Sequence, residues 1–87
     1  MYIILVYDVE ERKVVKVHKY LKTKINWIQN SVFEGEVTES ELVKIKSKLK
    51  KMLNKNYDSV IIFCLFTKRY TKRVIIGLEK SKIENVL

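Results

Sequence analysis

The sequence contains few of the residues on which many well-known sites depend. It has one cysteine, no proline and only two glycines, Gly35 and Gly77, in 87 residues. A single cysteine cannot form a disulfide within the chain, and a reduced, intracellular setting fits it best. Two isolated glycines exclude a glycine-rich phosphate-binding loop, and no CxxC, HExxH or Ser/His/Asp pattern occurs. The common nucleotide-binding, zinc and triad chemistries are therefore excluded.

Long apolar runs are also missing. The longest, Val60–Phe66, has seven residues, whereas a membrane-spanning helix needs roughly 18 or more. The apolar segment 1–7 has no basic start and meets Asp8 at once, unlike a signal peptide. With 47% apolar residues and no proline, the chain is not a disordered one. We therefore expect one folded domain in the cytoplasm that does not enter a membrane.

Positive charge is the dominant feature of what is present. Lysine and arginine number 18 against 10 aspartates and glutamates, a formal net charge of +8. The sequence pI of about 9.6 exceeds the value of about 9 that is typical of a domain binding a polyanion. A lysine-rich soluble surface would give the same numbers, so composition alone leaves both interpretations open.

The first half of the chain alternates strand and helix patterns. Segment 2–7 is continuously apolar, which predicts a strand buried on both faces and central in a sheet. Segment 10–24 predicts a helix, because apolar residues recur at helical spacing along it. Its apolar stripe is formed by Val14, Val17, Leu21 and Ile25, and a second face carries Arg12, Lys16 and Lys19.

Two short strands and a second helix are predicted next. Asn30-Ser31 would divide segment 25–37 into antiparallel strands Asn26–Gln29 and Val32–Val37. Thr38 and Glu41 form a capping-box pattern, which starts a helix that runs to about Leu53. The buried stripe of this helix would be Leu42, Ile45, Leu49 and Met52, and its exposed side carries Lys44, Lys46, Lys48, Lys50 and Lys51.

The C-terminal part is predicted to add a polar turn over 54–58 and a second fully buried strand over 59–66. A basic loop over 67–72 and a short strand over 73–76 follow. We expect residues 1–77 to form the domain and residues 78–87 to form a tail whose apolar residues pack on another subunit.

This order of elements predicts an α+β, ferredoxin-like (split βαβ) antiparallel sheet with two helices on one face. The other face would expose a large apolar surface, which usually marks an interface. A homodimer is therefore expected.

Most chemically capable side chains have an ordinary structural explanation. Cys64 lies within an apolar strand and is predicted to be a buried thiol. His18 lies within a helical apolar stripe, where a packed or interface histidine is a better interpretation than a general base. The aromatic residues are expected in the core or an interface rather than under stacked bases; they include Trp27, Phe33, Phe63 and Phe66.

Asp8 is the candidate catalytic and metal-binding residue. It follows a strand predicted to be central and precedes a helix, so it is either a site carboxylate or an ordinary helix-capping aspartate. Mg²⁺ usually takes one or two carboxylates together with waters and substrate phosphates. Three other acidic residues could share a metal with Asp8, and all are predicted to be exposed: Glu10, Glu11 and Asp58. A two-fold homodimer would place Asp8 opposite its own copy.

Nearly the whole chain resembles the CRISPR-associated protein two family, the small subunit of the spacer-acquisition machinery. The most specific stretch is 27–36, WIQNSVFEGE, which follows a first strand that ends in Tyr7-Asp8. Further matching positions are Val9, Arg12, Lys16-Val17-His18-Lys19, Leu21, 58–62 (DSVII) and Ile76-Gly77.

The resemblance implies a ferredoxin-like homodimer that exchanges its C-terminal strand, with Asp8 of both subunits holding Mg²⁺ (or Mn²⁺). It implies a Mg-dependent endonuclease that acts on single-stranded RNA or double-stranded DNA. Alternatively, it implies a non-catalytic scaffold that bridges integrase subunits and binds the spacer-precursor duplex. A ribonuclease toxin of similar fold is a third, weaker alternative. Tyr7 and Ser31 would lie beside the aspartate, and Phe33 at an interface.

The predicted nucleic-acid contacts are the basic residues of the two helices, because lysine and arginine position the phosphate backbone. They are Arg12, Lys16, Lys19, Lys44, Lys48 and Lys51.

Overall fold

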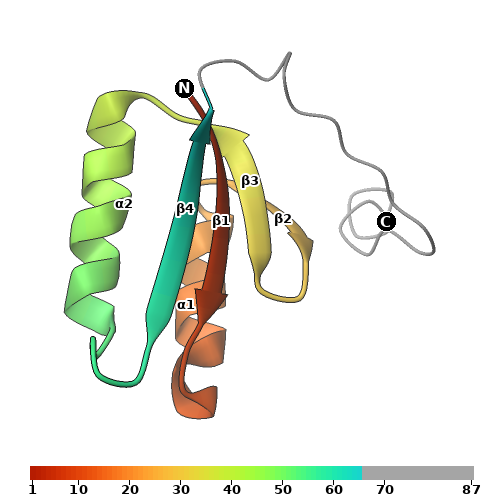
Figure 1. Cartoon of the computed structure of the whole chain (residues 1–87). Coiled ribbons are helices and arrows are strands. Elements are labelled where there is room, and N and C mark those ends of the chain that lie inside the picture. Colours follow the sequence, from red (N-terminus) through yellow and green to blue (C-terminus); the bar gives the residue numbers. More distant parts are fainter. Residues whose placement is uncertain (66–87) are drawn as a thin grey trace.

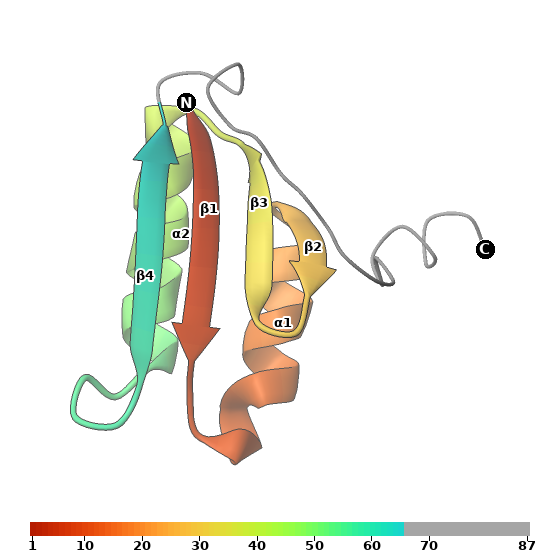
Figure 2. The ribbon, with the colours of Figure 1, turned by 45° about the vertical axis from the view of Figure 1, so that its right-hand side comes forward.

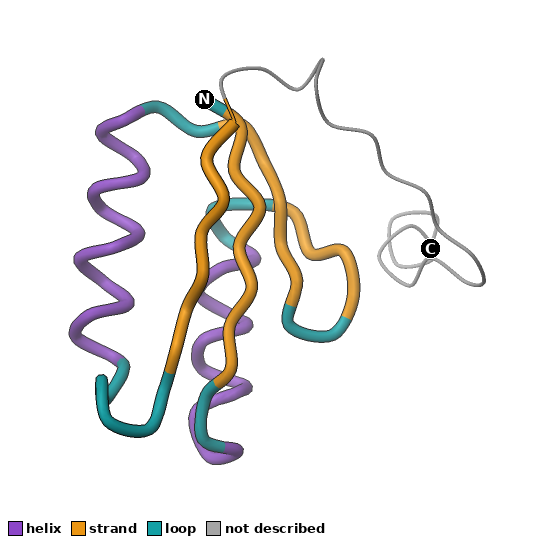
Figure 3. Tube along the Cα trace, viewed as in Figure 1, coloured by secondary structure: helices purple, strands orange, loops and turns teal. Residues whose placement is uncertain are grey.

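The computed structural model describes residues 1–65 (Figures 1 and 3). Strand β1 (Tyr2–Asp8) leads through a 3₁₀ turn, η1 (Glu11–Lys13), into helix α1 (Val14–Lys22). The hairpin of β2 (Asn26–Gln29) and β3 (Val32–Glu36) follows. Helix α2 (Glu39–Met52) and strand β4 (Ser59–Leu65) complete the described part. Neither helix within 1–65 is long and apolar enough to cross a membrane.

The strands form one antiparallel sheet in the order β2-β3-β1-β4. Each helix therefore connects two strands that have another strand between them, which is the split βαβ arrangement predicted from the sequence. Figure 2 shows both helices behind the same face of the sheet. The predicted α+β ferredoxin-like architecture is confirmed, with β1 in a central position.

The core lies between the sheet and the helices. Ile3 and Leu5 of β1 have no solvent exposure, and Leu5 pairs with Phe33 on one side and Ile62 on the other. The buried residues of the helices face them, as the 3.6-residue period requires; they are Val17, Leu21, Ile45 and Leu49. Because side chains alternate along a strand, Ile4, Val6 and Asp8 belong to the opposite face, which no described helix covers.

Local signals set the boundaries of the second helix and of the hairpin. The Thr38 hydroxyl accepts a hydrogen bond from the Glu41 amide (3.0 Å), and the Glu41 carboxylate accepts one from the Thr38 amide (2.9 Å). Asn30 has a φ of 46°, a conformation that asparagine tolerates better than most residues. The predicted capping box and the predicted break at Asn30-Ser31 are both confirmed.

The first helix begins later than predicted. Glu10 is extended (φ −53°, ψ 141°) and the chain turns through η1 before α1 starts at Val14. The cause is a contact between residues far apart in sequence. The Glu10 amide donates a hydrogen bond to the carboxylate of Asp58 (2.9 Å), which holds Glu10 in an extended conformation outside the helix. α1 also ends at Lys22, two residues before the predicted end at Lys24.

Strand β4 is not fully buried, which corrects the prediction. It is the edge strand of the described sheet, and Ile61 and Phe63 are 55% and 53% exposed. Cys64 is exposed and is therefore not the buried thiol expected from its apolar neighbours. The predicted end of this strand at Phe66, the loop 67–72, the strand 73–76 and the tail 78–87 lie outside the described residues.

Candidate functional site at the carboxyl end of strand β1

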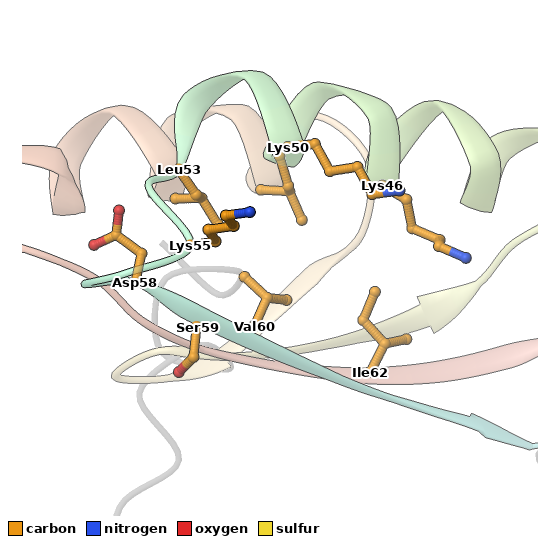
Figure 4. A pocket seen from close by; sticks show the side chains of 9 residues that line it. Lys46, Lys50, Leu53, Lys55, Asp58, Ser59, Val60 and Ile62 are labelled. Atoms are coloured by element: carbon orange, nitrogen blue, oxygen red, sulfur yellow. The ribbon is translucent and has the colours of Figure 1, made fainter.

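Asp8 is the last residue of the central strand and its side chain is exposed. It pairs with Ser59, the first residue of β4, while the amide of the preceding Tyr7 donates to the carbonyl of Ser31 (3.2 Å). Figure 4 shows the Ser59 side chain pointing away from α2, toward the face to which Asp8 belongs. The backbones of Tyr7 and Ser31 thus lie at the strand end that carries Asp8, and Ser59 lies opposite Asp8; the Tyr7 side chain, in contrast, is buried on the core face.

Asp8 is not a helix cap. The residue at the N-cap of η1 is Glu10, the residue at the N-cap of α1 is Lys13, and neither helix start has a side-chain cap hydrogen bond. The competing explanation of Asp8, that it accepts from the first amides of the following helix, is therefore wrong. Within residues 1–65 its carboxylate takes part in no ion pair and caps no helix.

Tyr7 and Phe33 lie on the core side of this strand end. Their ring centroids are 6.2 Å apart, and burial raises the pKa of the Tyr7 hydroxyl. Phe33 is fully buried and also contacts His18 edge-on, at 5.1 Å between centroids. Phe33 is therefore part of this chain's own core rather than of an exposed interface, and His18 is a packed histidine, as predicted.

The prediction that Asp58 is exposed is wrong, because the residue is buried. Its side chain has no solvent exposure, and its carboxylate accepts from the Glu10 amide (2.9 Å), the Asn54 amide (2.8 Å) and Lys13 Nζ (2.5 Å). These donors, led by the Lys13 ammonium, lower the pKa of Asp58 to about 2. Asp58 fastens the segment that follows Asp8 to the start of β4.

Glu10 is also engaged in ion pairs, whereas Glu11 is exposed on η1. Glu10 pairs with Lys13 (3.3 Å) and with the exposed Arg12 (3.5 Å). Asp58 and Glu10 together hold Lys13, whose pKa they raise. Asp8 is the exposed carboxylate at this end of the open side of the sheet, whereas Glu36, at the other end of β1, pairs with the N-terminal ammonium. Within residues 1–65 no group of three or more histidine, cysteine or acidic side chains could hold a metal on its own.

One carboxylate still fits a Mg²⁺ site. Mg²⁺ binds through one or two carboxylates and keeps several positions for waters and substrate phosphates. Asp8 is exposed, pairs with Ser59 in the β-ladder and is not used by another cation in the described part of the chain. The donor set therefore suits a metal whose remaining ligands come from substrate or from a second copy of the chain.

The predicted phosphate-binding residues do not gather around Asp8. Lys16 and Lys19 are exposed on α1, and Lys44, Lys48 and Lys51 are exposed on α2. Both helices cover the sheet face opposite to the one on which Asp8 lies (Figure 2). Arg12 lies nearest in sequence, but its side chain is exposed and paired with Glu10, and such exposed pairs contribute little energy.

Comparisons with known proteins show to which family the chain belongs. The family model for "CRISPR associated protein Cas2" matches residues 1–73. The chain belongs to the Cas2 family. It is 49% identical, over the full length of both chains, to a protein of Pyrococcus furiosus named "CRISPR-associated endoribonuclease Cas2". A protein of the same name from Methanothermobacter thermautotrophicus is 44% identical, with 100% of this chain and 96% of the relative covered.

Solved Cas2 structures share this fold. A structure titled "Crystal structure of cas2" aligns with a TM-score of 0.85 and 42% identity, covering 93% of this chain and 91% of the other. The Cas2 family model spans every strand and helix described above. The resemblance predicted from the stretch 27–36 is therefore confirmed.

Proposed function

We propose that this Cas2-family protein is a metal-dependent endonuclease of the CRISPR spacer-acquisition system that hydrolyses phosphodiester bonds. The observation that supports it most is the exposed Asp8 carboxylate at the end of the central strand, which caps no helix. The relatives named endoribonucleases, at 44–49% identity over essentially the full length, support the same reaction class. Single-stranded RNA is the first substrate to test, and double-stranded DNA the second.

The strand end supplies the groups that the reaction needs from the protein. Asp8 would hold Mg²⁺ or Mn²⁺, which polarises a phosphate and activates water when bound. The exposed Ser59 lies opposite Asp8 in the β-ladder and can donate a hydrogen bond to a phosphate oxygen. Asp58 and Lys13 keep this strand end in place, so that the carboxylate needs little reorganisation to receive the metal.

A homodimer would complete the site. The open sheet face presents Ile61 and Phe63, each more than half exposed, beside Ile4 and Val6. Exposed apolar patches of this kind mark protein–protein interfaces. Asp8 lies at one end of this patch, so an isologous contact would bring two Asp8 carboxylates toward one axis. We expect residues 78–87 to contribute to this contact.

A scaffold role is a second candidate. The lysines of α2 and α1 are exposed on the face opposite the proposed cleavage site, where they could bind a duplex without presenting it to Asp8. Their positive charge suits the phosphates of a duplex. In this role the protein would act in the cytoplasm, where it would bind the spacer-precursor duplex and bridge integrase subunits. In that role cleavage would be dispensable.

Cleavage by an Asp8→Asn variant separates the two functions. The variant keeps the size of the side chain and removes the charge that a metal requires. We expect Mg²⁺-dependent RNA cleavage to fall by a factor of at least about 100, as on removal of a major electrostatic contribution to the transition state. Duplex binding and dimer mass should not change. Equal cleavage by wild type and Asp8→Asn would overturn the nuclease proposal and assign the activity to a contaminant.

A further inference from the structure

An exposed aromatic side chain lies at the same end of the sheet as Asp8. Tyr57 is 73% exposed, more than any other aromatic residue within 1–65. It belongs to the turn between α2 and β4, two residues before Ser59, which pairs with Asp8. Paired residues lie at most about 5.5 Å apart and each residue spans at most about 3.6 Å, so the Cα atoms of Tyr57 and Asp8 lie within about 13 Å of each other. Figure 1 shows this turn and the end of β1 at one end of the molecule.

Hydrogen bonds hold the backbone of the turn in place. The Asn54 carbonyl accepts from the amides of Tyr57 (3.0 Å) and Asp58 (2.8 Å). The Asp58 carboxylate accepts from the amide of Glu10 (2.9 Å), in the segment that follows β1. The turn therefore stays beside the site without any help from the Tyr57 ring. Only the two side-chain torsions of the tyrosine have to be ordered when the ring binds a ligand, which makes such binding cheap in entropy.

The Tyr57 ring has no structural task within residues 1–65. It contacts no other ring and no cation there, its hydroxyl forms no hydrogen bond, and it is not part of the core. Tyr57 also precedes β4, so a strand of a second copy that paired with β4 would not pair with this turn. The ring is therefore available to a ligand that approaches the end of the sheet.

Basic side chains accompany Tyr57 at this end of the molecule. Lys55 is exposed and forms no ion pair within residues 1–65. Arg12 of η1 is 74% exposed, and its contact with Glu10 is of the exposed kind that contributes little energy. Lysine and arginine bind the phosphates of nucleic acid. A strand that passes Asp8 therefore meets cations for its phosphates and one ring for a base.

We propose that Tyr57 stacks on an unpaired base of the strand whose phosphate lies at Asp8, and thereby selects single-stranded over duplex substrate. The proposal rests on the proposed nuclease function, since it takes the substrate to pass Asp8. Aromatic side chains stack on every base, and one such contact increases affinity about 5–150-fold. Inside a duplex both faces of a base are covered by the neighbouring base pairs, so Tyr57 gains this contact only with an unpaired base.

Binding of a fluorescein-labelled oligouridylate in EDTA tests the proposal without metal or cleavage. We expect Tyr57→Ala to weaken binding at least about fivefold, and Tyr57→Phe, which keeps the ring, to change it less than twofold. The affinity for duplex DNA should change less than twofold in both variants. Val43→Ala is the control, because it removes another exposed apolar side chain (63% exposed) near the opposite end of α2, and it should leave RNA binding unchanged.

An abasic scan of the oligouridylate identifies the stacked base. Removing that base should weaken binding by the wild type but not weaken binding by Tyr57→Ala any further, since both changes remove the same contact. Additive losses at every position, or equal weakening of RNA and duplex binding by Tyr57→Ala, would overturn the proposal. A change in dimer mass caused by Tyr57→Ala would also overturn it, because the ring would then belong to a contact between copies.

The outcome can be separated from that of the nuclease proposal. If cleavage survives Asp8→Asn while Tyr57→Ala still weakens RNA binding, the nuclease reaction is overturned and Tyr57 remains an RNA contact. If Asp8→Asn abolishes cleavage while Tyr57→Ala binds RNA like the wild type, the stacking role alone is overturned.

Discussion

Lys13 and Asp58 form an ion pair with 2.5 Å between Nζ and Oδ2, across 45 residues of sequence. The lysine side chain is 14% exposed and the aspartate side chain is fully buried. Together with the hydrogen bond from the Glu10 amide to Asp58, this pair closes the loop between β1 and α1 onto the start of β4. The position of Asp8 therefore depends on a residue that is distant in sequence.

Replacing Asp58 should destabilise the protein strongly. Asp58→Asn leaves the largely buried Lys13 ammonium without its main charged partner, and breaking a buried pair in this way costs about 3–5 kcal/mol. Urea unfolding at pH 7 measures the cost. Glu11→Gln, on the exposed surface of η1, is the control and should change the free energy of unfolding by less than about 0.5 kcal/mol. Equal stability of the two variants would contradict the role of Asp58.

Acid should destabilise the protein in a defined window. The pKa of Asp58 is lowered from 3.8 to about 2 in the folded state, mainly by Lys13. The unfolded chain therefore binds more protons than the folded chain between these values, and the free energy of unfolding falls as the pH falls from about 4 to 2. Urea unfolding at several pH values measures this slope. The slope should be shallower for Asp58→Asn. An unchanged slope would show that Asp58 is not the group responsible for the loss of stability in acid.

Gly35→Ala should destabilise β3. A Cβ atom at Gly35 would lie 2.9 Å from Cγ2 and 3.2 Å from Cβ of Ile25, and such overpacking costs about 1–3 kcal/mol. The double variant Gly35→Ala/Ile25→Ala provides the control, because Gly35→Ala should cost less where the Ile25 side chain has been truncated. Thermal unfolding of the four proteins measures the coupling. Equal costs in both backgrounds would show that the close approach is not the cause.

The lysines of α2 should separate into two functional groups. Lys44, Lys48 and Lys51 are the predicted nucleic-acid contacts, whereas Lys46 and Lys50 line a pocket between α2 and β4. Replacing the first three by glutamine should lower the slope of log K against log salt for duplex DNA by about 2–3, since each phosphate contact contributes about 0.9. K46Q/K50Q is the control and should leave the slope nearly unchanged. An equal decrease of the salt slope in both variants would indicate that the duplex responds to the total charge of the helix rather than to these three lysines.

The elements that could be predicted from sequence are those set by neighbours along the chain. The capping box needs only Thr38 and Glu41, and the hairpin break needs only Asn30-Ser31. Helical and strand periods likewise report which face of an element is buried. Together with the apolar run of β1, these signals were sufficient for the ferredoxin-like architecture and for the placement of Asp8 at a strand end.

The features that could not be predicted depend on contacts between distant segments. An apolar strand has the same composition at the edge of a sheet as at its centre, so the exposure of Ile61 and Cys64 depends on what packs beside β4. Asp58 in a polar turn looks like a solvated residue, because its partners Glu10 and Lys13 are 48 and 45 residues away. The pocket between α2 and β4 likewise exists only once the helix and the edge strand are side by side.

Paramagnetic broadening by Mn²⁺ tests the central claim, that Asp8 is the metal-binding carboxylate, most directly. In titrations of the ¹⁵N-labelled protein we predict that the amides of Asp8, Val9 and Ser59 broaden first, and that Asp8→Asn abolishes this pattern. The acidic residues Glu36 and Glu39 near the start of α2 provide an internal comparison. Broadening centred on those residues, or unchanged by Asp8→Asn, would contradict the account.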